Sequence, residues 1–201
     1  MHGDCHVDTN YNSGKARLDI YHTRKNYDLI LKKKAILEQV NGVKVTIVEK
    51  EDSRPLKNGG TRRGYRLQTN FSRYFFTMKV APFKFVSKQL VKPKALALLW
   101  MDDGTVCWHR KGDKTYFSTA TLATDDWQSY RLACLRRAWN NAYGWCPSAM
   151  PYRCRGVLYT RLRLTKNQTE KLTEVIRNHV VESMQYKLVP FKTSEGSHEP
   201  S

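Results

Sequence analysis

Two adjacent carboxylates, Asp102 and Asp103, stand where the sequence predicts the end of a helix. The apolar stretch 94–103 follows Pro93, which suits a first helical turn, and precedes Gly104, which suits a left-handed cap. The carboxyl end of a helix carries negative potential, so each anion there is disfavoured by about 0.3–1 kcal/mol. A divalent cation would relieve this, and Mg²⁺ held by a carboxylate together with phosphate oxygens is the natural candidate. From these residues alone, a helix that simply ends in solvent explains the pair equally well.

Net charge is the second clue to function. The 201 residues include 35 Lys and Arg against 18 Asp and Glu, which gives a net charge of +17. Both halves are positive, because residues 1–100 hold 20 basic and 8 acidic residues and residues 101–201 hold 15 and 10. With 11 Tyr, 7 Phe and 5 Trp interleaved, this distribution favours a nucleic-acid-binding surface that spans the molecule. The alternative is a basic protein whose charge serves only solubility.

Polar side chains that could read DNA bases alternate along the predicted strands. Arginine pairs with guanine in the major groove, and asparagine or glutamine pairs with adenine. A single strand of this kind is more often a solvated sheet face, but the pattern recurs in both halves and therefore favours DNA reading. The candidate readers are Arg17 and Tyr21, then Arg66, Gln68 and Asn70 on one strand face, and Arg161 and Arg163 on another with Tyr159 and Thr165. We expect Arg62 and Arg63, beside the basic loop 54–60, to contact phosphates.

The elements that would position these residues form two similar halves. Hydrophobic periodicity predicts strands over 16–23, 43–49 and 62–70 with a helix over 26–40 capped by Asn26, and then helices over 94–103, 125–143 and 166–180 with strands over 115–122 and 157–165. The segment between Asn70 and Pro82 has no clear period, and 192–201 reads as a frayed tail. The repeated order predicts an α+β protein with internal pseudo-two-fold symmetry. We expect an N-terminal half-domain over 1–90, a C-terminal half-domain over 91–191 and a disordered tail over 192–201.

Membrane insertion and secretion are not expected from this sequence. The longest apolar run, 95–101, has seven residues, whereas a bilayer-spanning helix needs about 20. Residues 1–6 contain no apolar signal-peptide core. We therefore expect an intracellular protein with no membrane partner, and the cytoplasm of a bacterium, a phage-infected cell or an organelle fits equally well.

The five cysteines never occur as C-x-x-C, and their number is odd. Without a secretory signal they are best interpreted as reduced thiols. A structural zinc site, at Cys5 with His2 and His6 or at Cys107 with His109, is the weaker alternative because no second pair has the spacing that zinc requires.

Residues 93–104 read Pro-x-x-Leu-Ala-x-x-Trp-Met-Asp-Asp-Gly, which resembles the second signature helix of the single-chain LAGLIDADG homing endonucleases. Gly3-Asp4-Cys5-His6-Val7 resembles the end of the first signature of that family. The stretch 15–38 resembles the first strand and helix of these enzymes, and 79–82 and 183–188 resemble the segments that supply two functional lysines. The resemblance extends from about residue 3 to residue 190.

This resemblance implies an α+β LAGLIDADG fold with two pseudo-symmetric αβαββα-like halves and saddle-shaped antiparallel sheets. It also implies a site-specific endonuclease that cuts double-stranded DNA with Mg²⁺, mobilises an intron, intein or free-standing gene, and acts as a monomer. Asp4 and Asp103 would then each hold the metal against a scissile phosphate. Lys79 and Lys187 would position or activate the attacking water, and Asp102 would support the turn.

The chain departs from the family pattern at its first signature, because the sequence begins two residues before Gly3. We expect the first signature helix to be largely missing, which would leave Ala95, Ala97 and Leu98 as an uncovered apolar face that promotes self-association. A site with one working half would nick rather than cut both strands. An intron maturase that binds intron RNA, or a DNA-binding regulator, is the alternative function, and the retained acids and lysines favour the nuclease.

Overall fold

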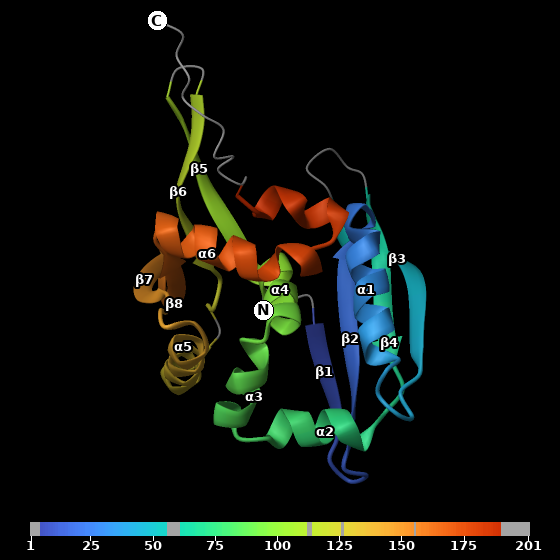
Figure 1. Cartoon of the computed structure of the whole chain (residues 1–201). Coiled ribbons are helices and arrows are strands. Elements are labelled where there is room, and N and C mark those ends of the chain that lie inside the picture. The colour runs from blue at the N-terminus through green and yellow to red at the C-terminus, as the bar shows by residue number, and fades with distance from the viewer. Residues whose placement is uncertain (1–4, 56–60, 112–113, 126, 155, 190–201) are drawn as a thin grey trace, which may run out of the picture.

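Two four-stranded antiparallel sheets lie on either side of a central helix in the computed structural model (Figure 1). The structure describes residues 5–55, 61–111, 114–125, 127–154 and 156–189. The strands of the first half are β1 (Cys5–Asn10), β2 (Lys15–Thr23), β3 (Val45–Pro55) and β4 (Thr61–Thr69). Those of the second half are β5 (Gly104–Lys111), β6 (Lys114–Leu122), β7 (Ser148–Cys154) and β8 (Val157–Leu164).

The helices connect and cover these sheets. They are α1 (Tyr27–Leu37), α2 (Arg73–Val80), α3 (Phe83–Leu90), α4 (Pro93–Asp103), α5 (Ser129–Tyr143) and α6 (Lys166–Ile176). Short 3₁₀ helices are η1 (Arg24–Asn26), η2 (Arg177–His179) and η3 (Glu182–Lys187). Within the described part of the chain, none of them combines the length and apolarity that crossing a bilayer requires.

Both sheets have the same strand order, which confirms the predicted repeat. The orders are β1-β2-β4-β3 and β5-β6-β8-β7. In each half a helix, α1 or α5, connects the second strand to the third, and a further helix, α2 or α6, follows the fourth. The central helix α4 lies between the two sheets, as Figure 1 shows.

Three strands that periodicity did not predict, β1, β5 and β7, all lie at sheet edges. An edge strand has less apolar surface to bury, so its sequence shows a weaker hydrophobic pattern. Pro151 lies within β7, where an edge position tolerates the missing N–H donor.

The segment between Asn70 and Pro82 is helical rather than irregular, because it contains α2. Its aromatic residues are typical of strands. Ser72, however, accepts a hydrogen bond from the backbone N of Tyr74 at 3.2 Å and so caps the helix, while Phe75 is buried.

Two predicted helix ends also differ from the structure. Asn26 occupies the N-cap position of α1, but its side chain makes no capping hydrogen bond. Gly104 follows α4 with an extended backbone (φ −80°, ψ 144°) instead of the expected left-handed one. Glycine is required there for another reason, because a Cβ would lie 2.3 Å from Cδ2 of Trp100.

The larger hydrophobic core surrounds α4. Trp100 and Met101 are buried in it, and Leu29 of α1 joins it from the first half. The expectation of an uncovered apolar face is wrong at Ala97, which is completely buried, while Ala95 and Leu98 are half-buried. This packing fixes the direction in which the carboxyl end of α4 points.

Candidate active site and nucleic-acid interface

The carboxyl end of α4 separates its two neighbouring acids. Both Asp102 and Asp103 are half-buried. The Nζ atom of Lys33, on α1, lies 2.7 and 2.9 Å from the two carboxylate oxygens of Asp102. His22, on β2, brings Nε2 to 2.8 Å from the same Nζ and to 3.6 Å from Oδ1 of Asp102. Asp102 therefore joins the two halves of the molecule. The role predicted for it from the sequence was support of the turn.

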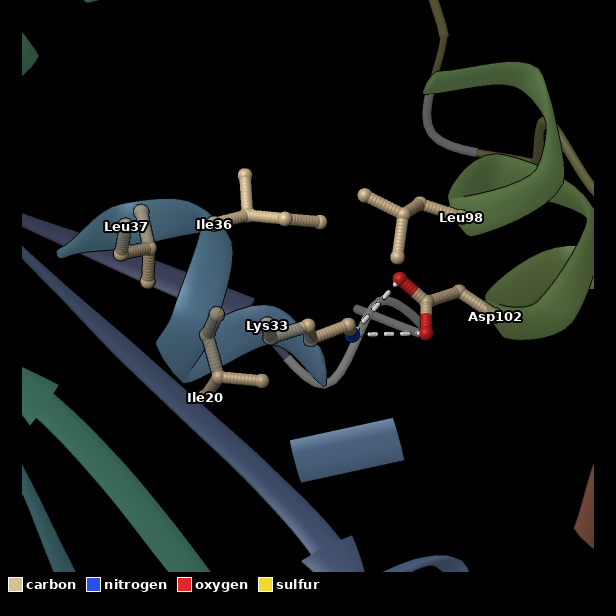
Figure 2. Close-up of a pocket in the computed structure, with 6 residues that line it drawn as sticks. All are labelled: Ile20, Lys33, Ile36, Leu37, Leu98 and Asp102. Carbon is tan, nitrogen blue, oxygen red and sulfur yellow. Dashed lines mark hydrogen bonds and ion pairs between the residues drawn. The ribbon is translucent and has the colours of Figure 1, made fainter. Parts of the chain in front are cut away.

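This ion pair borders an apolar cavity of about 200 Å³ between α1 and α4. Figure 2 shows Lys33 and Asp102 meeting beside Ile36 and Leu98, which extend from the two facing helices. Lys33 is buried, with 8% of its side chain exposed, so its charge requires a close anion. Asp102 supplies that anion, which assigns it a structural role.

Lys187 lies at the same end of α4. Its Nζ donates hydrogen bonds to the backbone oxygens of Met101 at 2.5 Å and Asp102 at 3.3 Å. In return, Nε1 of the buried Trp100 donates to the backbone oxygen of Lys187 at 3.0 Å. A cation at this position offsets the negative end of the helix dipole. The predicted pair of Asp103 and Lys187 is therefore brought to one helix end.

The segment that carries Lys187 is anchored to the first half through Asp28. The backbone N and the Oγ of Ser183 donate to the Asp28 carboxylate at 2.9 and 2.5 Å. Burial raises the pKa of Asp28, but the hydrogen bonds from Ser183 and Leu29 outweigh it and hold that pKa below its ordinary value. Residues of α1 thus help to position η3.

Only one member of the other predicted catalytic pair lies within the described residues. Asp4 lies outside the described residues. Lys79, at the end of α2, is exposed; its Nζ donates to Oγ1 of Thr9 at 3.1 Å and lies 5.9 Å from the centre of the Tyr11 ring. Thr9 is the fifth of the six residues of β1, so Lys79 lies beside the carboxyl-terminal part of that strand.

The Asp103 carboxylate suits a metal site in which a bound phosphate and water molecules supply the other ligands. Among the described residues, no group of three or more His, Cys, Asp or Glu side chains could hold a metal ion. Mg²⁺ does not require such a cage, since it usually takes one or two carboxylates, waters and phosphate oxygens. A carboxylate at a helix end with a lysine close by meets that requirement.

One face of the first sheet is polar and carries four of the predicted DNA contacts. In the strand register Tyr21 lies opposite Arg66, and Asp19 opposite Gln68. Directly opposed residues of antiparallel strands point to the same side. Arg17, two residues from Asp19, shares that side. Ile20 and Leu67, on the other side, are buried in the core.

Asp19 organises this polar face. Nε and Nη2 of Arg66 donate to its two carboxylate oxygens, and Nε2 of Gln68 donates at 3.1 Å. The hydrogen bond from Arg66 is the main reason that the pKa of Asp19 lies below its ordinary value. Arg17 forms a separate ion pair with Asp8 at 3.0 Å.

The second sheet presents a similar face. Nε and Nη2 of Arg161 each donate to an Asp125 oxygen at 2.7 Å, and the guanidinium lies 3.7 Å from the centre of the Tyr152 ring. Arg163 is exposed on the same face, with Nη1 3.5 Å from Sδ of Met150. Leu162, between the two arginines, is completely buried on the opposite side.

Residues 1–172 match the model of the LAGLIDADG DNA endonuclease family. The chain belongs to that family. A solved structure of the homing endonuclease I-WcaI bound to its DNA recognition sequence is similar, with a TM-score of 0.68 and 17% identity over 93% of this chain and 81% of that one. Mesophilic variants of the homing endonuclease I-DmoI match with a TM-score of 0.51 and 18% identity over 88% and 89%. Both likenesses show the LAGLIDADG fold, and no curated protein matches the chain.

Asn70, predicted as a base contact of this LAGLIDADG chain, does not lie on the polar face, and Arg63, a predicted phosphate contact, is separate from that face. Asn70 lies beyond β4, and its amide accepts from the backbone N of Lys44 and donates to the oxygen of Gly42. Arg63 points to the same side as the core residue Leu67 and pairs with Glu51 at 2.8 Å. The side chain of Arg62 lies outside the described residues, and so does the predicted tail 192–201.

Thr165, expected on the face of Arg161 and Arg163, instead begins α6. Its Oγ1 accepts from the backbone N of Gln168, and the Gln168 side chain accepts from the backbone N of Thr165, which forms a capping box.

Several residues of this LAGLIDADG site were not predicted from the sequence. Lys33 stands within Lys32-Lys33-Lys34, and spacing alone does not distinguish a buried lysine from its neighbours. Asp28 and Asp125 act on partners 155 and 36 residues away, respectively. Only the fold brings such pairs together.

Proposed function

We propose that this LAGLIDADG endonuclease cuts both strands of a specific DNA duplex with Mg²⁺, and that Asp103 is the metal ligand of the second half. One observation carries the proposal. At the end of α4, Asp102 is engaged by Lys33 while the Lys187 ammonium lies on the adjacent backbone oxygens, so Asp103 and Lys187 lie at the same helix end. This arrangement suits a phosphate that is bound through a metal.

Bound Mg²⁺ would supply Lewis-acid polarisation of the scissile phosphate and lower the pKa of a water molecule. The residues of the chain would provide position and charge. Asp103 would hold the cation at the helix end, where its own charge is otherwise disfavoured. Lys187, held through Trp100, would stabilise the negative charge that develops on the phosphate and would orient the attacking water.

The first half would supply the site for the other strand through Asp4 and Lys79. The identical strand order of the two sheets supports this pairing of half-domains, 1–90 and 91–191. Their polar faces would contact the duplex on both sides of the cleavage positions, with the chain acting as a monomer. Arg17, Tyr21, Gln68 and Arg163 would contribute to these faces.

A pair of neighbouring variants tests the assignment of Asp103. The substrate is a plasmid that carries the insertion junction of the chain's own gene. We expect Asp103→Asn to reduce the cleavage rate at least about 100-fold, which is the usual effect of removing one group that stabilises charge in the transition state. DNA affinity should change less than about 5-fold. Asp102→Asn is the matched control, because it removes the same charge one residue away; it should lower stability but retain Mg²⁺-dependent cleavage.

If Asp102→Asn abolishes cleavage in folded protein and Asp103→Asn does not, the assignment of the two acids is wrong. If the wild-type chain binds the junction tightly and never cuts it with Mg²⁺, the chain is a non-cleaving DNA-binding member of the family.

A further inference from the structure

Two arginines, one in each half, are held by a buried aspartate in the same way. In both cases Nε donates to Oδ1 and Nη2 donates to Oδ2, for Arg66 with Asp19 and for Arg161 with Asp125. The aspartate side chains are only 9% and 7% exposed, whereas the arginine side chains are 34% and 28% exposed. Each carboxylate is therefore at the base of its pair, and each guanidinium is the part that solvent reaches.

The two pairs involve corresponding strands of the repeated fold, although the aspartates lie at different positions relative to them. Arg66 lies on β4 and Arg161 on β8, which are the fourth strands of their halves. Asp19 comes from β2, and Asp125 comes from the segment that directly follows β6, the equivalent strand. Both arginines point away from the core, because Leu67 and Leu162 beside them are completely buried. The same arrangement therefore recurs on the polar faces of both sheets.

The geometry determines which edge of each guanidinium can meet a ligand. The carboxylate occupies the Nε and Nη2 edge, so the Nη1 and Nη2 end carries the remaining N–H donors. Two parallel donors of this kind match the O6 and N7 acceptors of guanine in the major groove. Because two bonds hold each side chain in one orientation, less conformational entropy is lost when DNA binds.

The surroundings of Arg161 restrict it further. Its guanidinium lies 3.7 Å from the centre of the Tyr152 ring, which fixes the plane of the group. Arg163, on the same face, has its Nη1 atom next to Sδ of Met150. Arg17 pairs with Asp8, whose side chain is 41% exposed and so provides a weaker support.

We infer that Arg66 and Arg161 each read one guanine of the target site, and that Asp19 and Asp125 are positioning residues that set this specificity. The inference rests on the proposed function only in taking double-stranded DNA as the ligand. It predicts two fixed G·C base pairs in the target, one for each half of the protein.

The test is a binding selection from a library of randomised DNA duplexes, carried out with the full chain in EDTA so that cleavage is not required. We expect Arg66→Lys to reduce the preference for guanine about tenfold or more at one position, and Arg161→Lys to do so at a different position, because lysine keeps the charge but not the paired donors. Asp19→Asn and Asp125→Asn should each weaken the preference for guanine at the same DNA position as the lysine variant of the partner arginine.

Glu49→Gln is the matched control, because it disrupts the exposed Arg24–Glu49 ion pair of the first sheet. It should leave the selected sequence unchanged. Thermal unfolding followed by circular dichroism identifies any variant that is no longer folded at the selection temperature, and the lysine variants keep the test decisive if an aspartate variant unfolds.

Unchanged guanine preference in folded Arg66→Lys and Arg161→Lys would overturn the inference. Aspartate variants that weaken the base preference equally at all DNA positions would also overturn it, since that result would make the two pairs purely structural. A wild-type chain that selects the two guanines but never cuts DNA with Mg²⁺ would contradict the proposed cleavage and leave the base-reading inference supported.

Discussion

Asp102 and Asp103 are adjacent and chemically identical, yet their surroundings give them different roles. Asp102 contacts the buried Lys33 and His22 of the first half, whereas Asp103 ends the helix beside the Lys187 segment. A buried lysine without an anion would cost several kcal/mol, so the ion pair is required once Lys33 is buried. The pair thus ties the end of α4 to the first half and engages one of the two adjacent carboxylates there.

Replacing Lys33 with Met tests this ion pair. The substitution leaves Asp102 partly buried without its cation, and we expect the free energy of unfolding to fall by about 2 kcal/mol in urea. The double variant Lys33→Met with Asp102→Leu should recover most of that loss, because neither charge then remains. A double variant no more stable than Lys33→Met alone would mean that the ion pair is not the source of the effect.

At the scale of elements, the position of Lys187 depends on the contact between α1 and η3. Asp28 accepts two hydrogen bonds from Ser183, and its pKa lies below its ordinary value of 3.8. A carboxyl whose pKa is lowered by folding stabilises the native state above its unfolded pKa. That contribution is lost as the pH falls through the lower pKa of the folded state.

Asp28→Asn should therefore cost about 1 kcal/mol at pH 7. The difference from wild type should narrow as the pH is lowered below 3.8, because Asp28 becomes protonated in the folded state as well. Urea unfolding at a series of pH values measures both. A difference that stays constant over this range would show that the charge of Asp28 does not stabilise η3.

The junction of α4 and β5 depends on Gly104. An added Cβ would lie 2.3 Å from the ring of the buried Trp100. We expect Gly104→Ala to lower the free energy of unfolding by about 1–3 kcal/mol through overpacking. The same substitution should slow cleavage, because Trp100 also holds the backbone of Lys187. Unchanged stability would mean that α4 moves to accommodate the methyl group at no cost.

Sequence periodicity predicted the central strands, the edge strand β3 and the helices α1, α4, α5 and α6, but neither α2 nor α3. The strands β2, β4, β6 and β8, all inside their sheets, were expected, because burial on one face imposes alternation. The edge strands β1, β5 and β7 were missed for the converse reason. α2 was missed because a cap at Ser72 and a single buried Phe75 outweigh the strand preference of its aromatic residues.

For the whole molecule, the net charge of +17 predicts strongly salt-dependent DNA binding. If the two polar faces neutralise about six phosphates or more, the affinity should fall about 10³-fold between 50 and 200 mM salt. Fluorescence anisotropy of a labelled duplex measures this slope. A nearly flat slope would exclude extensive phosphate contact by the sheets.

The candidate site was predictable from the sequence only where a motif marks it. Asp103 and Lys187 were expected together, and the structure brings both to the end of α4. Lys33, Asp19 and Asp125 were not expected as partners, because each acts through a contact that only the folded chain creates. Local pattern thus indicates the groups that do chemistry, and tertiary structure selects the groups that hold them.

Cleavage of a supercoiled plasmid that carries the insertion junction tests the central claim most directly. Wild-type chain with Mg²⁺ should convert it to linear DNA, and EDTA or Asp103→Asn should prevent this. Nicked circles as the final product would contradict a working site for each strand. An unchanged plasmid, despite a clear gel shift of the same DNA, would contradict Mg²⁺-dependent cleavage altogether.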